Sequence, residues 1–355
     1  MHIDDLLIHM EARDASDLYL KTGVPPMLRV AGELAPAGGL PLTDEVIRGL
    51  ASEMMTERHR REFEEHRRAD IAYASPTLGR FRVNVYVQRG SPAVVIRRVR
   101  TRIPSFDELR LPPPVARLAL APRGLVLVTG QTGSGKTTTL AAMIGYRSRQ
   151  QPGHIVTIED PIEFVHADDK SIVSQREIGT DCESYSLALR DALRQAPDVI
   201  LIGEIRDEES ATAAVHFAET GHLVLSTLHS NNASQTLERL LHFFPVESHP
   251  GVALQLSLNL IGIISQRLVP RADGEGRVVA AEVMLSTPRV RELLRKADLT
   301  DIRTVMQSPA GIQEGMQTFD YAIYQLIQQG LVDSETAMSA ADSPNDLRLR
   351  LKGLL

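Results

Sequence analysis

Apolar and polar positions alternate in the first third of the chain. The alternation is clearest at residues 80–87, and a second strand pattern follows at 93–97. A period of two predicts strands with one buried face and one solvent-facing face. Weaker strand signals at 17–30 and a polar helical run at 43–66 complete the pattern. We therefore expect residues 1–110 to form a small α+β domain with a mainly antiparallel sheet.

Continuous apolar runs replace this alternation in the middle of the chain, and stretches suited to helices separate them. Strands that alternate with helices predict a largely parallel, doubly wound sheet. The pattern after about residue 246 is mostly helical, with a further strand pair near 268–269 and 278–283. The apolar runs occupy residues 125–129, 155–158, 199–202 and 223–226.

Prolines separate these two parts of the chain. Three consecutive prolines end at Pro114, and Pro122 follows shortly before Gly124. Consecutive prolines cannot continue a helix or a central strand. We expect a linker at residues 111–123 and a second domain at 124–355, helical from about residue 287. A length of 355 residues suits two domains.

Composition and charge restrict the class of protein. The hydrophobic fraction of 43% and charged fraction of 24% are typical of a globular protein. A net charge of −6 argues against a nucleic-acid partner. The first residues are acidic where a secretory signal would be basic, and no apolar stretch reaches the roughly 20 residues that span a bilayer. We expect a cytoplasmic protein without direct membrane insertion.

Residues 130–137 fit the pattern G-x-x-x-x-G-K-[ST], between an apolar strand and a helix-compatible run. Glycines let backbone N–H groups turn toward phosphate oxygens, and the helix N-terminus adds positive partial charge. Lys136 should reach the β- and γ-phosphates, and Thr137 should hold Mg²⁺. The motif predicts that ATP binds to Gly130, Gln131, Thr132, Gly133, Ser134, Gly135, Lys136, Thr137 and Thr138.

Carboxylates follow two of the predicted central strands. Glu204 comes just after the run at 199–202, at the sheet edge where ligands bind, and is the candidate for Mg²⁺. Asp198 precedes that run, so we expect it in a turn at the opposite edge. The acids around Pro161, including Glu163, should reach the same edge as Glu204. One of them could deprotonate the attacking water, and the alternative is a set of solvated acids around a proline turn.

A histidine and two arginines are further candidates. His229 should lie at the carboxyl end of the strand at 223–226, where it could sense a γ-phosphate; a structural role is the alternative. Arg82 and Arg97 lie on the last strands of the small domain. They are either solvated strand-face charges or arginines that reach a triphosphate across a subunit interface.

These segments resemble the secretion and pilus ATPase superfamily, and within it the pilus-retraction branch of the PilT and PilU type. The resemblance covers essentially the whole chain. Its motifs are the loop at 130–137, an aspartate-rich box at 157–163, an atypical Walker B segment ending at Glu204 and a histidine box at 222–229. The family fold implies a PAS-like first domain, a RecA-like second domain and a homo-hexameric ring with ATP at the cleft between domains.

The resemblance also assigns roles to particular residues. It implies that Lys136 and Thr137 hold phosphate and Mg²⁺, and that Glu204 lies at the Mg²⁺ site. Glu163 is then the general base, and His229 lies near the γ-phosphate.

A few differences from related ATPases indicate the position of this chain within the family. The single cysteine, Cys182, excludes the four-cysteine zinc motif of the related pilus-assembly and type II secretion ATPases. Residues 194–198 and 341–350 resemble PilU more than PilT, and the helix that PilT proteins use in retraction is altered at 290–297. The resemblance implies an accessory motor that acts with a PilT-like partner ATPase and the pilus platform protein, at the cytoplasmic side of the inner membrane.

We therefore expect an ATPase that powers type IV pilus retraction and twitching motility through nucleotide-driven domain closure. Three alternatives stay open at this point. A secretion or conjugation ATPase would energise export, although the missing zinc motif argues against it. A non-hydrolysing nucleotide-binding scaffold could support a catalytic partner in a mixed ring, although the full set of acids argues against this. A DNA-pumping motor fits the acidic charge balance least.

Overall fold

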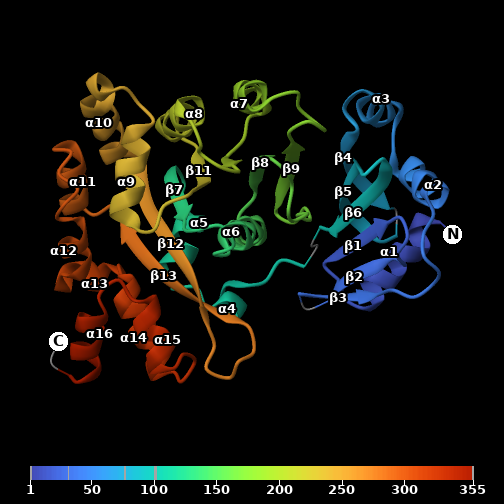
Figure 1. The fold of residues 1–355 in the computed structure, drawn as a ribbon. Helices are drawn as coiled ribbons and strands as arrows, with labels where there is room; N and C mark the ends of the chain where they lie inside the picture. The colour runs from blue at the N-terminus through green and yellow to red at the C-terminus, as the bar shows by residue number, and fades with distance from the viewer. Residues whose placement is uncertain (1, 31, 76, 100–101, 354–355) are drawn as a thin grey trace. The chain divides into compact units, whose positions relative to one another are not determined.

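The computed structural model describes residues 2–30, 32–75, 77–99 and 102–353 (Figure 1). Contacts divide the chain into two compact units, Met1–Thr101 and Arg102–Leu355. The segment expected to be a linker, residues 111–123, therefore belongs to the second unit. It contains helix α5 (Pro114–Ala119), and a short helix α4 (Phe106–Leu109) precedes it. Proline is compatible with α5 because it occupies the first helical position, where its missing N–H has no helical partner to lose.

The first unit is a six-stranded antiparallel sheet with helices on one face. The strand order is β3-β2-β1-β6-β5-β4. Alternate buried residues of β5 confirm the predicted period of two, whereas β6 buries three successive residues, Pro92 to Val94. The elements are α1 (Ile3–Ala12), β1 (Asp17–Lys21), β2 (Met27–Val30), β3 (Glu33–Pro36), α2 (Asp44–Met54), α3 (Glu57–His66), β4 (Arg68–Ser75), β5 (Gly79–Gln88) and β6 (Ser91–Arg98).

The second unit contains a seven-stranded sheet in the order β13-β12-β7-β11-β10-β8-β9. Neighbours from β12 to β9 are parallel, and β13 pairs antiparallel with β12. The four apolar runs are β7, β8, β10 and β11, which confirms the predicted α/β fold class. The strands are β7 (Gly124–Thr129), β8 (Gly153–Glu159), β9 (Ser171–Glu177), β10 (Val199–Ile202), β11 (Leu223–Leu228), β12 (Leu260–Pro270) and β13 (Arg277–Leu285).

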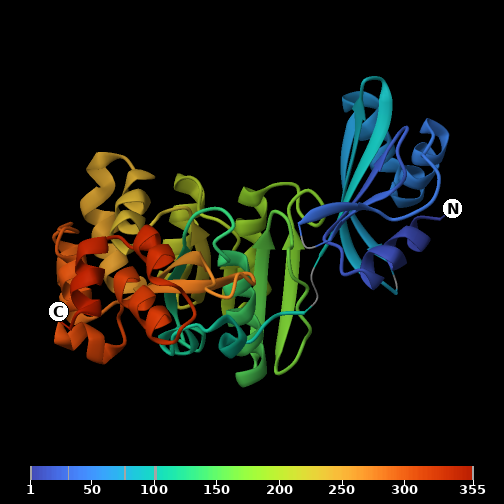
Figure 2. The ribbon, with the colours of Figure 1, turned by 60° about the horizontal axis from the view of Figure 1, so that its bottom comes forward.

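Helices cover both faces of this sheet. Helices α5 and α6 (Lys136–Gln150) pack on one face. The other face is covered by α7 (Tyr185–Ala192), α8 (Glu208–Glu219), α9 (Ala233–His242) and α10 (His249–Asn259). Figures 1 and 2 show α6 and α8 on opposite sides of the strands.

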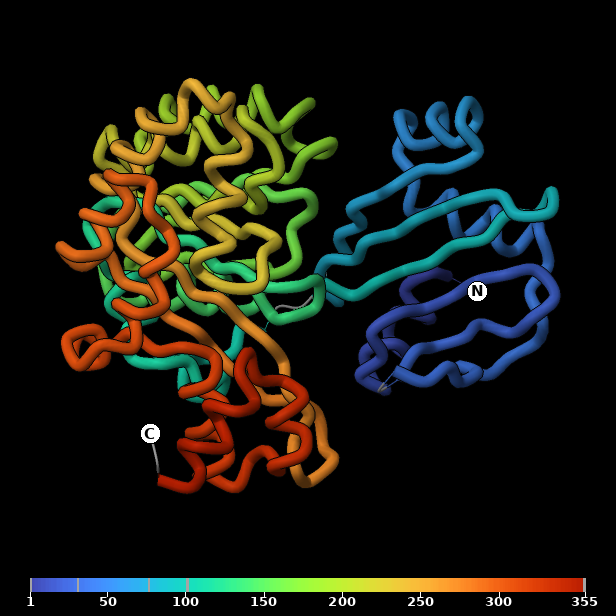
Figure 3. The backbone as a smooth tube through the Cα atoms, turned by 60° about the vertical axis from the view of Figure 1, so that its left-hand side comes forward, coloured from blue at the N-terminus to red at the C-terminus, as the bar shows by residue number. Residues whose placement is uncertain are grey.

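The C-terminal part is helical, as predicted, and packs around the β12–β13 hairpin. Helices α14 to α16, red in Figure 3, form an apolar cluster with residues of β12 and β13, shown in orange. No helix among the described residues is long and apolar enough to cross a membrane. The helices are α11 (Pro288–Arg295), α12 (Ile302–Gln307), α13 (Pro309–Glu314), α14 (Phe319–Gln328), α15 (Ser334–Ala340) and α16 (Pro344–Leu351).

Candidate active site

The predicted site residues of the second unit follow the carboxyl ends of neighbouring parallel strands. The phosphate loop follows β7, and Glu163 lies in the segment after β8. Glu204 follows β10, and His229 comes directly after β11. Because these strands are parallel and in register, their ends meet at one edge of the sheet.

The phosphate loop has the backbone geometry that an anion cradle requires. Gly130, Gly133 and Gly135 have φ angles of 145°, 79° and 92°, which favour glycine. A Cβ on Gly130 would lie 2.5 Å from the Gln266 carbonyl oxygen and from Ser134 Oγ, so only glycine fits there. Gly133 and Gly135 have nothing within 4 Å of a built Cβ, so this side of the loop is open to a ligand.

Helix α6 begins inside the predicted motif, with Gly135 as its N-cap. Thr137 and Thr138 are therefore in its first turn, half-buried, where their backbone N–H groups belong to the anion-binding end of the helix. Gln131 and Thr132 are exposed and line an open cavity of about 600 Å³ together with His229. The backbone of the loop and its exposed face can therefore accommodate a polyphosphate chain.

Lys136 is buried beneath the loop and bonds to the loop itself. Its Nζ donates to the carbonyl oxygens of Gly130 at 2.9 Å and Gln131 at 3.0 Å. Burial lowers the pKa of Lys136, while Glu204 and Glu163 act in the opposite direction. The Lys136 ammonium group therefore bonds to two loop carbonyl oxygens, and the charges of the two predicted acids favour its protonated form.

His229 connects Lys136 to Glu204. Its Nδ1 lies 3.4 Å from Lys136 Nζ, and its Nε2 lies 3.1 Å from Glu204 Oε1. A lysine ammonium has only donors, so Nδ1 must accept and Nε2 must carry the proton that faces the carboxylate. The structure therefore brings together three of the predicted residues in one polar chain.

Tyr185 of α7 holds the backbone beneath Glu204. Its hydroxyl accepts from the Glu204 N–H at 3.2 Å and donates to the Ile158 carbonyl oxygen at 3.3 Å. Burial raises the pKa of Tyr185 to about 12, so the hydroxyl keeps its proton. A Cβ on Gly203 would lie only 3.1 Å from the same carbonyl oxygen, which explains the glycine before Glu204.

Glu163 is exposed, and its segment is held by the buried Glu159. The Glu159 carboxylate accepts from the Glu163 N–H, from Thr157 Oγ1 at 2.7 Å and from Gln175 Nε2 at 3.1 Å. Burial raises the pKa of Glu159, and the hydrogen bonds from Thr157 and Gln175 oppose the shift. The exposed carboxylate therefore stands on a fixed backbone.

Two side chains of β9 hold the rest of this segment. Gln175 Nε2 donates to the Phe164 carbonyl oxygen at 2.8 Å, and its Oε1 accepts from the His166 N–H at 2.8 Å. Glu177 Oε2 accepts from the Ile162 N–H at 3.1 Å. We call Gln175 and Glu177 the β9 brace, because together they bond to three backbone groups around Glu163.

Asp198, which was expected in a turn at the opposite edge, and His222 of the histidine box both lie away from this edge. The Asp198 carboxylate accepts from the His154 N–H at 2.8 Å, beside the amino ends of β8 and β10. His222 Nδ1 lies 3.0 Å from the Phe217 carbonyl oxygen, at the start of β11. Both are structural contacts.

Arg82 and Arg97 lie opposite each other on β5 and β6 of the first unit. Arg97 Nε donates to Asp17 Oδ1 at 2.8 Å, and the Arg97 side chain is 62% exposed. Asp17 is buried and also lies 3.6 Å from Arg29.

Sequence reasoning missed Glu159 as a distinct residue, Gln175 and Tyr185. Glu159 stood among the acids around Pro161 without a role of its own. Gln175 and Tyr185 come from β9 and α7, and no spacing along the chain links them to Glu163 or Glu204. Their role follows from tertiary contacts alone.

Comparisons with known proteins agree with this geometry. A family model described as type II/IV secretion system protein matches residues 77–345. The type IV pilus ATPase PilU of Pseudomonas aeruginosa is 48% identical, over 99% of this chain and 92% of the relative. PilT of the same organism, a type IV pilus retraction ATPase, is 41% identical over 98% of this chain and 100% of the relative.

A solved structure is also similar. The crystal structure of the pilus retraction motor PilT with bound ADP has a TM-score of 0.92 at 42% identity, and the match covers 98% of this chain and 99% of that one. The family inferred from the motifs is thereby confirmed. This chain belongs to the type II/IV secretion system protein family and, within it, to the type IV pilus retraction ATPases of the PilT and PilU type.

Proposed function

We propose that this chain hydrolyses ATP with Mg²⁺ to power type IV pilus retraction, as a PilU-like accessory motor. The observation that carries the proposal is the polar chain of Lys136, His229 and Glu204 at the mouth of the glycine cradle. In this proposal the three side chains surround the γ-phosphate of a nucleotide bound to the phosphate loop.

Substrate binding falls to the loop and the first turn of α6. Backbone N–H groups of residues 130–138 receive the phosphates, and Lys136 exchanges its bonds to loop carbonyls for bonds to phosphate oxygens. Thr137 and Glu204 are the residues that would hold Mg²⁺, since hydroxyl and carboxylate oxygens are its preferred ligands. The ion supplies charge stabilisation for the transferred phosphoryl group.

Glu163 is the general base in this proposal. Its carboxylate is exposed to water and raises the pKa of Lys136, and this electrostatic effect supports a role beside the phosphate loop. A carboxylate on a fixed segment can orient a water molecule and accept its proton during attack on the γ-phosphate. His229 donates from Nε2 to Glu204 and so keeps that carboxylate oriented.

Motor action in this proposal requires neighbouring subunits. We propose a homo-hexameric ring in which Arg82 or Arg97 of one subunit approaches the nucleotide of the next, as an arginine that stabilises transition-state charge. The exposed guanidinium of Arg97 supports this role. The ring would act with a PilT-like partner ATPase on the pilus platform protein, at the cytoplasmic side of the inner membrane.

Phosphate release from ATP by the purified chain tests the enzymatic part. Lys136→Ala and Glu204→Gln should each lower the Mg²⁺-dependent rate about 100-fold. Glu208→Gln is the matched control, an exposed acid at the start of α8 and close to Glu204 in sequence, and should keep the wild-type rate. Equal rates for all four proteins would contradict the proposed site.

Twitching of a deletion strain tests the biological part. Loss or reduction of twitching, restored by the wild-type gene and not by the Lys136→Ala variant, supports retraction. Normal twitching together with a protein secretion defect would instead support an export ATPase.

A further inference from the structure

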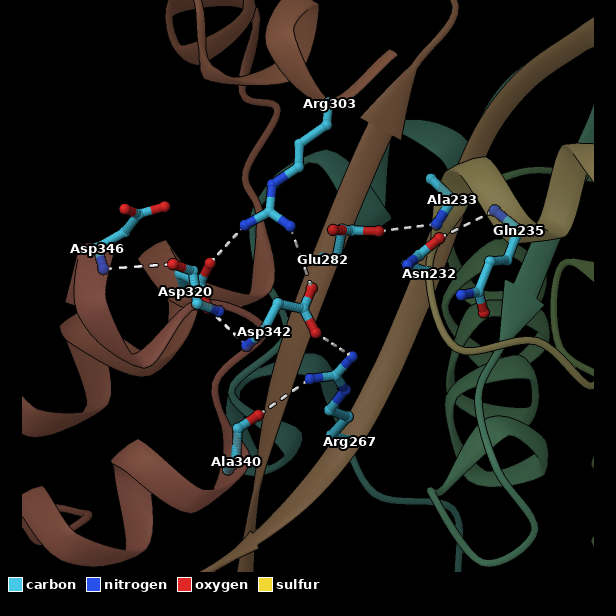
Figure 4. A network of polar contacts seen from close by, with 11 residues as sticks. Asn232, Ala233, Gln235, Arg267, Glu282, Arg303, Asp320, Ala340, Asp342 and Asp346 are labelled. Carbon is cyan, nitrogen blue, oxygen red and sulfur yellow. Dashed lines mark hydrogen bonds and ion pairs between the residues drawn. The ribbon is translucent and has the colours of Figure 1, made fainter. Parts of the chain in front are cut away.

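A buried carboxylate on the edge strand β13 contacts the helix that follows His229 in the chain. Glu282 of β13 is only 5% exposed. Its Oε1 accepts a 2.8 Å hydrogen bond from the Ala233 N–H, the first residue of α9 (Figure 4). Helix α9 begins just after His229, so this bond fixes the chain four residues beyond a predicted active-site residue.

The first turn of α9 is also bonded to the segment after His229 and to the last residue of β7, which leads into the phosphate loop. Thr236 Oγ1 lies 2.6 Å from Ser230 Oγ and 3.3 Å from Thr129 Oγ1. Thr129 directly precedes Gly130 and donates to Ser265 Oγ of β12 at 2.9 Å. A movement of the first turn of α9 would therefore shift the segment after His229 and Thr129, the residue before the phosphate loop.

Glu282 adjoins a set of charged residues that we call the C-terminal ionic cluster: Arg267, Arg303, Asp320 and Asp342. Arg267 Nη2 lies 2.5 Å from Asp342 Oδ1, and Arg303 Nη2 lies 2.6 Å from Asp320 Oδ2. Asp320 also accepts from the Asp342 N–H at 2.8 Å. The residues come from β12, α12, α14 and the segment between α15 and α16 (Figure 4).

The charges of this cluster balance without Glu282, because each arginine pairs with an aspartate. Burial raises the pKa of Glu282 to about 7; the Ala233 N–H lowers it, Asp342 raises it, and Arg267 and Arg303 lower it. Glu282 therefore changes charge near neutral pH.

The cluster and the phosphate loop also share a cavity of about 610 Å³. Its walls include the loop residues 130–134, Asn232 and Gln235 at the start of α9, and Ala340 and Asp342 of the C-terminal part. The phosphate loop and residues of the C-terminal part thus line one cavity within the same unit.

We propose that Glu282 is a positioning residue for the nucleotide site, which through Ala233 sets the first turn of α9 and couples ATP turnover to the C-terminal ionic cluster. The inference rests on the proposed ATPase function. An ionised Glu282 accepts the N–H at the positive end of α9 more strongly than a neutral one. Turnover should therefore rise as Glu282 loses its proton.

Glu282→Gln tests this without removing the hydrogen bond, since an amide oxygen still accepts from Ala233 but cannot ionise. We expect its kcat to match the wild type at pH 6 and to be about fivefold lower at pH 8.5, the difference between a charged and a neutral acceptor. The wild type alone should show an inflection near pH 7. KM for ATP should change less than kcat, and Glu275→Gln, an exposed acid in the β12–β13 turn, should behave as wild type.

Parallel pH profiles for wild type and Glu282→Gln would overturn the inference. A wild-type chain without phosphate release would instead contradict the proposed function. Amide hydrogen exchange separates the two outcomes, because it needs no turnover. Exchange at Ala233 should be faster in Glu282→Met, which has no acceptor, than in Glu282→Gln; equal exchange in the two variants would also overturn the inference.

Discussion

Gln175 gives the sharpest test of how the candidate base is held. Gln175→Ala removes three hydrogen bonds, at 3.1 Å to Glu159, 2.8 Å to the Phe164 carbonyl oxygen and 2.8 Å from the His166 N–H. A net contribution of about 0.5–1.5 kcal/mol for each bond, reduced by partial solvent access, gives a loss of about 2 kcal/mol. If the Glu163 segment must be held in place only in the transition state, this loss of about 2 kcal/mol should lower kcat about 30-fold.

Steady-state ATP hydrolysis and ADP affinity together measure this effect. We expect Gln175→Ala to lower kcat and to leave ADP affinity near wild type, because Gln175 contacts the Glu163 segment and not the phosphate loop. Ile172→Ala is the matched control, since Ile172 lies on the same strand and is 62% exposed. A wild-type kcat for Gln175→Ala would refute the idea that the β9 brace positions Glu163.

Gln175→Glu adds a pH dependence with a defined sign. The new carboxylate can still accept from the His166 N–H but faces Glu159, whose pKa burial already raises. The two carboxylates can share a proton at low pH and repel each other when both ionise. The variant should therefore lose more activity at pH 8.5 than at pH 6. An equal loss at both pH values would contradict the contact with Glu159.

Three other predictions follow from the same geometry. Burial raises the pKa of Glu282 to about 7 from an ordinary 4.5, so its ionisation lowers the free energy of unfolding of the wild type as pH rises from 4.5 to 7. Glu282→Gln does not ionise, so its free energy of unfolding in urea should rise by about 3 kcal/mol relative to the wild type between pH 4.5 and 8. A constant difference would contradict the raised pKa. His229→Ala should lower kcat at least about tenfold, because Glu204 and Lys136 lose their shared partner, while ADP affinity measured by calorimetry changes little. Arg97→Ala should be inactive alone yet regain activity when mixed with Lys136→Ala subunits, because each lacks what the other supplies; no recovery in mixed assemblies would contradict a role in trans.

The central strands could be predicted from sequence because parallel strands are buried on both faces and appear as continuous apolar runs. β9 escaped prediction because it is an edge strand whose residues are largely polar. The apolar stretch from 252 to 264 gave no sign that α10 ends at Asn259 and β12 begins at Leu260, since no glycine or proline separates the helix from the strand there.

Some residues of the candidate site could likewise be predicted from the sequence, and others could not. Lys136, Glu204 and His229 could be predicted because strand order alone brings them to one edge. The residues that hold them could not, because the contacts of Gln175 and Tyr185 depend on how distant elements pack. Glu282 did carry a signal, an acid with apolar residues on both sides along its strand, but its partner Ala233 is far away in sequence.

The most direct test of the account compares two acids at the end of β8. Glu163→Gln should still bind ATP but release phosphate about 100-fold more slowly than wild type, because it removes the general base. Asp160→Asn, which loses an exposed ion pair with Arg206, should hydrolyse ATP within a few-fold of wild type. Mg²⁺-dependent phosphate release at the wild-type rate by Glu163→Gln would contradict the proposed mechanism.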